Sequence, residues 1–421
     1  MTDTGDQRED IHLDLNDRDF IDHRHERYAE VRARCPVVFD TAAGGFWLVT
    51  DYDSVATIAR DNETFLHTFD LAAPDGIAYE GICGYPRHPE QPAQGVSEID
   101  GPDHQDLRRA LNARFSPAGV LALRPDLERV TTWFLDEVIE HGEMDLVLDF
   151  TSPVPAVLTL MQMGIPCEHW KRYADFFHTT AAHAAEDPEY QSVMSHVPEM
   201  MAEFAEFAAY RRTHPGDDIV TMLVNLERES GPLTDQQVVD VIFNLVAGGI
   251  DTTTSLVSWA LHHLGTDLDA RRRLIADRSL LGPAIEEYLR FYSPNETLTR
   301  TAARDVELGG RQISRGDRIW ISWVAANRDP AVFERPDEVL IDRANNRHLA
   351  FGLGGHRCIG MHLARAEAAA MIDEVLRRIP DYVVDPERFL PYPGGPMMTG
   401  ISSMPVSFTP GSRSGPTERP F

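Results

Sequence analysis

One cysteine lies in a setting that suits metal chemistry. Cys358 falls within a glycine-rich stretch at 351–360, immediately before a helical pattern that starts at Met361. Glycine permits turns and close backbone approach that a β-carbon would block, so a flat cofactor could lie against this stretch. A thiolate at a helix start also feels backbone N–H groups and the positive end of the helix dipole, which lower the thiol pKa and favour metal ligation. The sequence therefore predicts a metal-ligating thiolate at Cys358.

Two other interpretations of this cysteine are open at this point. A lone cysteine beside a glycine-rich turn is most often an inert, buried apolar residue. A cysteine nucleophile with His356 as its base is a further option, which would need a substrate pocket at Cys358 and no cofactor. The spacing of the neighbouring residues decides between the three interpretations.

The fixed residues around the cysteine follow the order F-G-x-G-x-H-x-C-x-G, with Phe351, Gly352, Gly354, His356, Cys358 and Gly360 in the fixed places. This stretch resembles the haem-binding signature of the cytochrome P-450 family and matches it at every fixed position. The resemblance implies a bacterial soluble haem-thiolate monooxygenase with haem b as its cofactor. It also implies that Cys358 binds the iron, that His356 binds a haem propionate, and that Phe351, Gly352 and Gly360 contact the haem. A thiolate ligand pushes electron density toward O–O cleavage.

Two glycines interrupt the longest helical pattern, where each costs up to ~1 kcal/mol relative to alanine. Gly248 and Gly249 allow either close helix packing or a local distortion that opens room for dioxygen and water. The stretch from Ala247 to Thr252 resembles the family's oxygen-activation motif, which favours the second interpretation. By that resemblance Gly248 lies at the haem, Asp251 relays protons, and Thr252 supplies a hydrogen bond where oxygen is activated.

The stretch 100–108 resembles the opening of the family's haem-contacting helix, and it departs from the family pattern at Gly101 and Asp103. His104 and Arg108 are four residues apart and would face one way. By this resemblance, His104, Arg108 and Arg300 are expected to bind the haem propionates. Without that resemblance, a His/Arg pair at this spacing is most often a solvated helix face.

A charge pair on one helix face is expected to be structural. Glu287 and Arg290 have the i,i+3 spacing, which alone carries little information because surface pairs of this kind are common. Their place between the long helix and the cysteine resembles the family's buried Glu-Arg pair, whose third partner would be Arg343. We expect these three residues to support folding and haem capture.

The elements that position these residues are mostly helical. The periodicity predicts helices at 125–141 and from the T-x-x-Q capping box at Thr234 to about 264, with short strands at 46–51, 305–310 and 318–324. The stretch 68–97 is expected to be a long loop that covers a site. The predicted fold class is mainly α with small β-sheets (α+β), the cytochrome P-450 fold, with haem between the long central helix and the helix after the cysteine.

The chain of 421 residues is expected to form one such domain at 16–408 between mobile tails at 1–15 and 409–421, and the resemblance covers about 20–408. The first thirty residues are polar, and the most apolar stretch, 238–250, is shorter than the ~20 residues that span a bilayer, which predicts a cytoplasmic protein without a membrane anchor. A formal net charge of −28 argues against nucleic acid as a partner. The scattered cysteines make a disulfide framework improbable.

Electrons, dioxygen and substrate complete the predicted reaction. No flavin or iron–sulfur domain is visible in the chain, so a ferredoxin and its reductase are the expected donors, steered by the arginines near the haem motifs, Arg108, Arg109, Arg114, Arg347, Arg357 and Arg365. The expected reaction inserts one oxygen atom into a C–H bond, by hydroxylation or epoxidation, of a lipophilic molecule such as a terpenoid, steroid, polyketide or cyclic peptide. The alternatives are a peroxide-driven peroxygenase and a non-catalytic haem-thiolate sensor; the pairing of Asp251 with Thr252 argues against both.

Overall fold

The computed structural model describes residues 10–83, 87–88, 91–394 and 397–421, and the N-terminal residues 1–9 of the predicted tail lie outside them. The helices in the described residues are α1 (Arg18–Asp22), α2 (Arg24–Arg34), α3 (Tyr52–Arg60), α4 (Gly101–Phe115), α5 (Pro117–Ala122), α6 (Arg124–Val138), α7 (Pro153–Met163), α8 (Trp170–Ala182), α9 (Pro188–Met194), α10 (Val197–Thr213), α11 (Ile219–Val224), α12 (Asp235–Thr266), α13 (Leu268–Ala276), α14 (Leu281–Tyr292), α15 (Trp323–Ala326) and α16 (Met361–Arg378).

The strands are short and form several small sheets. They are β1 (Val37–Asp40), β2 (Phe46–Val49), β3 (Phe65–Leu66), β4 (Phe69–Asp70), β5 (Tyr79–Glu80), β6 (Glu143–Asp145), β7 (Thr297–Ala302), β8 (Val306–Leu308), β9 (Arg311–Ile313), β10 (Arg318–Ser322), β11 (Val383–Val384), β12 (Leu390–Pro391), β13 (Ile401–Ser403) and β14 (Pro405–Ser407). Helices and small sheets together confirm the predicted fold class.

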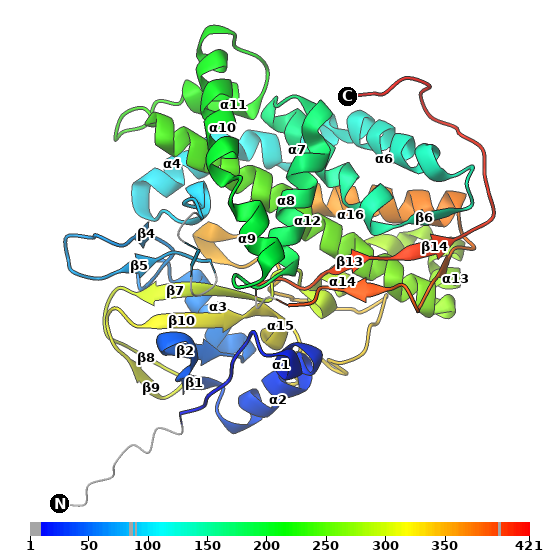
Figure 1. Ribbon diagram of the computed structural model, residues 1–421. Coiled ribbons are helices and arrows are strands. Elements are labelled where there is room, and N and C mark those ends of the chain that lie inside the picture. The colour runs from blue at the N-terminus through cyan, green and yellow to red at the C-terminus, as the bar shows by residue number, and fades with distance from the viewer. Residues whose placement is uncertain (1–9, 84–86, 89–90, 395–396) are drawn as a thin grey trace, which may run out of the picture.

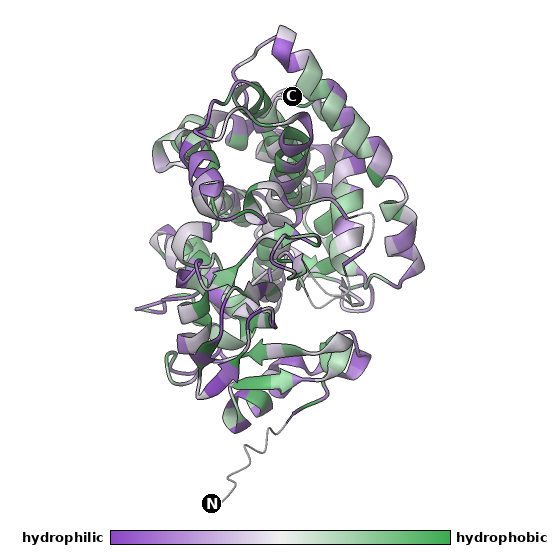
Figure 2. Ribbon diagram, turned by 90° about the vertical axis from the view of Figure 1, so that its left-hand side faces the viewer, coloured by the Kyte–Doolittle hydropathy of each residue, from purple (hydrophilic) through white to green (hydrophobic). Residues whose placement is uncertain are grey.

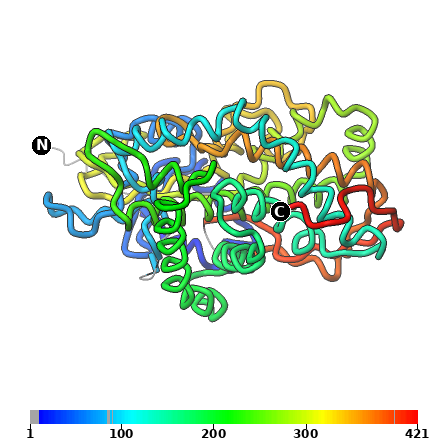
Figure 3. Tube along the Cα trace, turned by 90° about the horizontal axis from the view of Figure 1, so that it is seen from above, coloured from blue at the N-terminus to red at the C-terminus, as the bar shows by residue number. Residues whose placement is uncertain are grey.

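The largest sheet has the strand order β1-β2-β10-β7-β3. The pair β2–β10 is parallel, with Trp47 opposite Ile319, whereas the other pairs are antiparallel. In Figure 1 this sheet lies with α1 and α2 at the lower end of the molecule, and most helices gather at the other end. From above, the molecule is much longer in one direction than in the other (Figure 3).

Helix α12 is the longest helix, and its start is fixed by a capping box. Thr234 accepts from the Gln237 N–H at 3.2 Å, and the Gln237 side chain accepts from the Thr234 N–H at 3.0 Å, as the sequence predicted. By length and composition α12 could cross a membrane, although its most apolar stretch, 238–250, had been expected to be too short to do so. However, 78% of its most apolar stretch is buried in the fold, as is usual for a core helix. Figure 2 shows that the helices combine green, apolar segments with purple, polar ones.

The other predicted elements were found with shifted ends. The helix expected at 125–141 is α6, and the strands expected at 46–51 and 305–310 are β2 and β8. The strand expected at 318–324 ends at Ser322, because the Ser322 side chain caps a short helix that begins at Trp323. The loop expected at 68–97 contains the hairpin β4–β5 and a 3₁₀ turn at Gly95–Ser97 in its described part.

Mobile ends stay a prediction. The structure places the C-terminal residues 409–421 along α6, where the Ser414 and Gly415 N–H groups donate to Asp136. The Phe421 ring lies 5.6 Å from that of Phe134.

Candidate functional site

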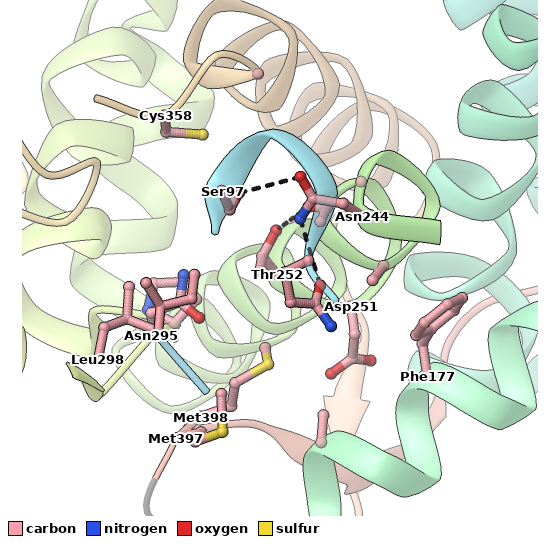
Figure 4. Close-up of a pocket in the computed structure, with 18 of the residues that line it drawn as sticks. Ser97, Phe177, Asn244, Asp251, Thr252, Asn295, Leu298, Cys358, Met397 and Met398 are labelled. Atoms are coloured by element: carbon pink, nitrogen blue, oxygen red, sulfur yellow. Dashed lines mark hydrogen bonds between the residues drawn. The ribbon is translucent and has the colours of Figure 1, made fainter. Parts of the chain in front are cut away.

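A cavity of about 430 Å³ lies between α12 and the segment that carries Cys358. Every residue that the sequence predicted for the site lines this cavity, namely His104, Arg108, Gly248, Asp251, Thr252, Arg300, Phe351, Gly352, His356, Cys358 and Gly360. In Figure 4 Cys358 and Thr252 lie on different sides of the open space. The structure thus brings the predicted residues together, and their individual roles stay predictions.

The turn before α16 holds Cys358 in place. The Cys358 N–H donates to the Phe351 carbonyl at 2.8 Å, which closes the turn. Gly354, in the same turn, has a φ of +70°, and a Cβ there would lie only 2.7 Å from the Ala59 carbonyl oxygen of α3. Only glycine meets both conditions, so the turn can pack directly on α3. Cys358 is exposed, and the space that it faces is the cavity.

The expectation of a lowered thiol pKa at Cys358 is wrong for the protein without a metal. Cys358 is exposed only to the interior cavity, where the surrounding protein separates it from bulk water, and this desolvation raises its pKa. The effect outweighs the Gly360 N–H and the guanidinium groups of Arg108, Arg365 and Arg357, which lower the pKa. Bonding to a metal deprotonates a thiol directly, so the ion itself would have to supply the missing stabilisation of the thiolate.

One end of the cavity gathers groups that suit an anion. The Arg300 side chain is buried, its Nε has no partner among the described residues, and burial lowers its pKa to about 9. Arg108 donates to the Arg357 carbonyl at 2.6 Å, and His356 Nε2 lies 3.0 Å from Asp100 Oδ1. Burial, followed by the charges of His356 and Arg108, lowers the pKa of His104 to about 3.

Three imidazole rings are stacked at this end. The His356 ring lies between those of His67 and His104, with centroid distances of 3.5 and 3.8 Å. Both ring nitrogens of His67 are buried without a partner among the described residues, and His67 also lines the cavity. Buried polar groups normally have partners, so the one N–H group of the neutral His67 ring and Arg300 Nε call for an acceptor in the cavity. The two carboxylates of haem b would meet this need, and Cys358 lines the same cavity as His67 and Arg300.

The two glycines of α12 have different surroundings. A Cβ on Gly249 would lie 2.5 Å from Thr159 Oγ1 on α7, so Gly249 allows close helix packing. A Cβ on Gly248 would meet no atom within 4 Å, and Gly248 lines the cavity. Helix α12 runs without a break through both residues, and the predicted local distortion stays a prediction. The open space comes from the missing side chain at Gly248.

The acid and the alcohol on α12 have separate partners. The Thr252 hydroxyl donates to the Gly248 carbonyl at 2.9 Å. Asp251 is buried and contacts two residues that the sequence analysis did not identify, His178 on α8 and Tyr392 beside β12. A lone histidine in a helix and a tyrosine beside a turn gave no signal by spacing or motif.

The charge pair on α14 is buried, as predicted. Arg290 donates to both oxygens of Glu287 at 2.8 Å and also binds the carbonyls of Asn327, Pro336 and Glu338. Arg343 Nε donates to Glu287 Oε2 at 2.9 Å, which confirms the third partner.

The family model described as Cytochrome P450 matches residues 163–380. A steroid C26-monooxygenase of Mycolicibacterium smegmatis is 32% identical over 91% of this chain and 92% of its own length. Cytochrome P450 107B1 of Saccharopolyspora erythraea is 32% identical over 92% of this chain and 95% of its own length.

Solved structures agree with these relatives. Cytochrome P450 CYP268A2 of Mycobacterium marinum, in complex with pseudoionone, superposes with a TM-score of 0.84 at 29% identity, over 94% of this chain and 98% of its own. CYP109E1 of Bacillus megaterium, in complex with testosterone, superposes with a TM-score of 0.82 at 28% identity, over 93% of this chain and 100% of its own.

Proposed function

The chain belongs to the cytochrome P450 family of oxygen-incorporating, haem-containing oxidoreductases. We propose that it hydroxylates a neutral lipophilic molecule and takes the electrons for this reaction from a ferredoxin. The observation that carries the proposal is the single cavity that joins Cys358 to the acid and alcohol of α12. The chain is further proposed to act in the cytoplasm.

The residues present fit haem b. Cys358 would bind the iron, and Arg300, Arg108, His104 and His356 would bind the propionates at the end of the cavity where unpartnered donors gather. When bound, a thiolate-ligated haem supplies the chemistry that splits dioxygen and inserts one of its atoms into a C–H bond.

The protein's own part in the reaction is to exclude water and to move protons. Thr252 and Asp251 are consecutive residues of α12 at the cavity, and they combine a hydroxyl with a carboxyl group. A carboxyl group can take protons up from a neighbouring group and pass them to a hydroxyl, which holds them near the reacting atoms. A peroxide-driven enzyme or a haem sensor has no need of such a pair, which favours the monooxygenase over both alternatives.

The lining of the cavity favours a neutral substrate. Away from Cys358 the walls include Phe177, Leu298 and the pair Met397 and Met398 (Figure 4). The described residues that line the cavity include two arginines and no lysine. Both arginines are the proposed propionate ligands, so no further arginine or lysine among the described lining residues is available to an acidic substrate.

The strand β7 and the segment before β13 contribute apolar groups to the wall. Leu298, Met397 and Met398 line the cavity, whereas the Glu296 carboxylate is bound by Arg24 and Tyr28. The relatives named for steroids and the structures with testosterone and pseudoionone support a steroid or terpenoid as the substrate class.

One spectrum tests the proposal. Reduced protein with carbon monoxide is expected to show the red-shifted Soret band of thiolate-ligated haem, and Cys358→Ser is expected to abolish this band while haem is still bound. A wild-type protein without the band would contradict the proposal. It would also revive the cysteine-nucleophile interpretation, although His356 Nε2 is already committed to Asp100.

A further inference from the structure

Both carboxylate oxygens of Asp251 are bound by side chains from other elements. His178 Nδ1 lies 2.9 Å from Oδ1, and the Tyr392 hydroxyl donates to Oδ2 at 2.5 Å. The Asp251 residue is 2% exposed, and in Figure 4 its carboxylate lies on the side of Thr252 away from Cys358. The acid therefore rests among partners from α8 and the β12–β13 hairpin, while Thr252 donates to Gly248.

The partners of His178 determine its protonation state. Nδ1 faces Asp251 Oδ1 and, at 3.2 Å, the oxygen of Tyr392, whose own hydrogen is used on Asp251. Nε2 faces the Ser402 carbonyl at 3.4 Å. Carboxylate and carbonyl oxygens only accept, so each ring nitrogen must carry a hydrogen. A histidine with two N–H groups is a cation, and His178 and Asp251 form an ion pair.

The charges and hydrogen bonds around His178 favour its protonated, cationic form. Burial lowers the pKa of His178, but the charge of Asp251, its hydrogen bond, the Ser402 carbonyl and the charge of Asp175 on the same helix raise it by more, so the pKa is raised overall. Burial and the Asp251 charge raise the pKa of Tyr392 well above its usual range, so Tyr392 remains a donor.

Gly400 leaves the space that Tyr392 occupies. A Cβ on Gly400 would collide with the Tyr392 ring, and the Tyr392 N–H donates to the Gly400 carbonyl at 3.0 Å. Because the backbone positions the tyrosine, its hydroxyl is directed at Asp251, and the three side chains form one hydrogen-bonded cluster.

We infer that His178 is a positioning residue that holds Asp251 and supplies it with protons, an inference that rests on the proposed monooxygenase function. The Nδ1 proton passes to Asp251 Oδ1, so that one N–H bond breaks, one O–H bond forms and both groups become neutral. The attraction between them is then lost, and the carboxyl group can turn about its Cα–Cβ bond toward Thr252 and give up the proton there. Solvent returns a proton to His178, whose side chain is 13% exposed.

The test measures dioxygen consumption per haem in the holoenzyme without substrate, driven by excess surrogate ferredoxin and reductase, across about pH 6 to 9, the range around the ordinary histidine pKa. The wild-type rate is expected to fall as pH rises through the raised pKa of His178. His178→Gln should lower the rate about tenfold or more, as expected when a proton donor is lost, and should remove this pH dependence.

A second variant separates proton supply from a merely structural role. His178→Arg keeps a cation opposite Asp251 but cannot give up its proton, so it should be as slow as His178→Gln. Rescue of rate and pH profile by arginine would overturn the inference, and so would a His178→Gln protein that behaves like wild type. His169→Gln, at the exposed start of the same helix, is the matched control and should leave both unchanged.

Two measurements separate this inference from the proposed function. The carbon monoxide spectrum and the peroxide-driven oxidation of guaiacol should be the same in wild type and in both His178 variants, because neither needs the relay. A wild-type protein that consumes no dioxygen would overturn both the function and the inference. A normal wild type with unaffected variants would overturn the inference alone.

Discussion

Arg290 donates two hydrogen bonds of 2.8 Å to Glu287, and neither side chain is exposed to solvent. Removing one partner would leave the other charge buried and uncompensated, which costs about 3–5 kcal/mol. We therefore expect Arg290→Ala to yield little folded, haem-loaded protein, measured as haem absorbance per protein after purification. The exposed i,i+3 pair of Arg272 and Asp269 is the matched control, and Arg272→Ala should change nothing measurable. Normal haem loading of Arg290→Ala would contradict the structural role.

The two glycines of α12 predict opposite effects of the same substitution. Gly249→Ala should lower the free energy of unfolding by about 1–3 kcal/mol, because the new methyl group meets Thr159 on α7. Gly248→Ala meets open space, so helix propensity should raise stability by up to about 1 kcal/mol. The methyl group should also slow the binding of carbon monoxide to the reduced protein. Urea unfolding and flash photolysis measure the two effects, and equal stabilities of the two variants would contradict this assignment.

Arg300 predicts how firmly the haem is held. Its buried Nε has no partner among the described residues, and burial lowers its pKa to about 9, so a propionate is the partner that it needs. Because hydrogen bonds to charged groups are worth about 1.5–3 kcal/mol, Arg300→Leu should speed haem transfer to apomyoglobin about tenfold or more. The exposed Arg304→Leu variant is the control. Unchanged haem release would show that Arg300 does not contact the cofactor.

Glu367 on α16 predicts a pH dependence of stability. Burial raises its pKa to about 8, against an ordinary value of 4.5, and a hydrogen bond with Thr253 lowers it by less. Between these two pH values the folded protein binds one proton that the unfolded chain does not bind. The free energy of unfolding should therefore fall by about 1.4 kcal/mol per pH unit as the pH rises through this window, and the effect should level off above it.

Glu367→Gln should remove this component, measured as the difference in urea midpoint between two pH values inside the window. The exposed Glu143→Gln variant should keep the wild-type slope. A wild-type slope in Glu367→Gln would show that other groups carry the dependence.

Ferredoxin docking predicts a salt-dependent effect at Arg109, which is 75% exposed beside Asp106. Arg109, Arg114 and Arg365 each pair with a carboxylate, and Arg109 is the better probe because its side chain is the most exposed of the three. Arg109→Glu should slow reduction by ferredoxin several-fold at low salt, and the difference should shrink at high salt as charges are screened. Arg272→Glu is the matched control, because the Arg272 side chain is 72% exposed and is also in an i,i+3 pair. Equal rates for both variants would refute docking at Arg109.

The sequence predicted those parts of the fold and site that depend on neighbours along the chain. The glycine turn at Cys358, the capping box at Thr234 and the buried partners of Glu287 are local patterns or follow from the family resemblance. The partners of Asp251 depend on packing instead. His178 lies 73 residues away and Tyr392 lies 141 residues away, and neither stands in a motif.

The sequence was least informative where burial or packing competes with an effect of neighbouring residues along the chain. The helix start favours a low thiol pKa at Cys358, but desolvation is larger. The two glycines of α12 left close helix packing and a local distortion open, and Gly249 lies in close contact with α7 whereas Gly248 faces open space. Whether the local effect or burial is larger depends on the element that packs against the residue. The sequence on either side of the residue does not show which element that is.

The parallel pairing of β2 with β10 has a consequence for how the protein forms in the cell. Trp47 and its neighbours leave the ribosome early, whereas their partner Ile319 is made late. Until then the β1–β2 hairpin has an unpaired apolar edge, which is the kind of edge that promotes aggregation. A translational pause between these strands would lengthen that exposure, so the yield of native protein should depend on chaperones that shield the nascent N-terminal hairpin.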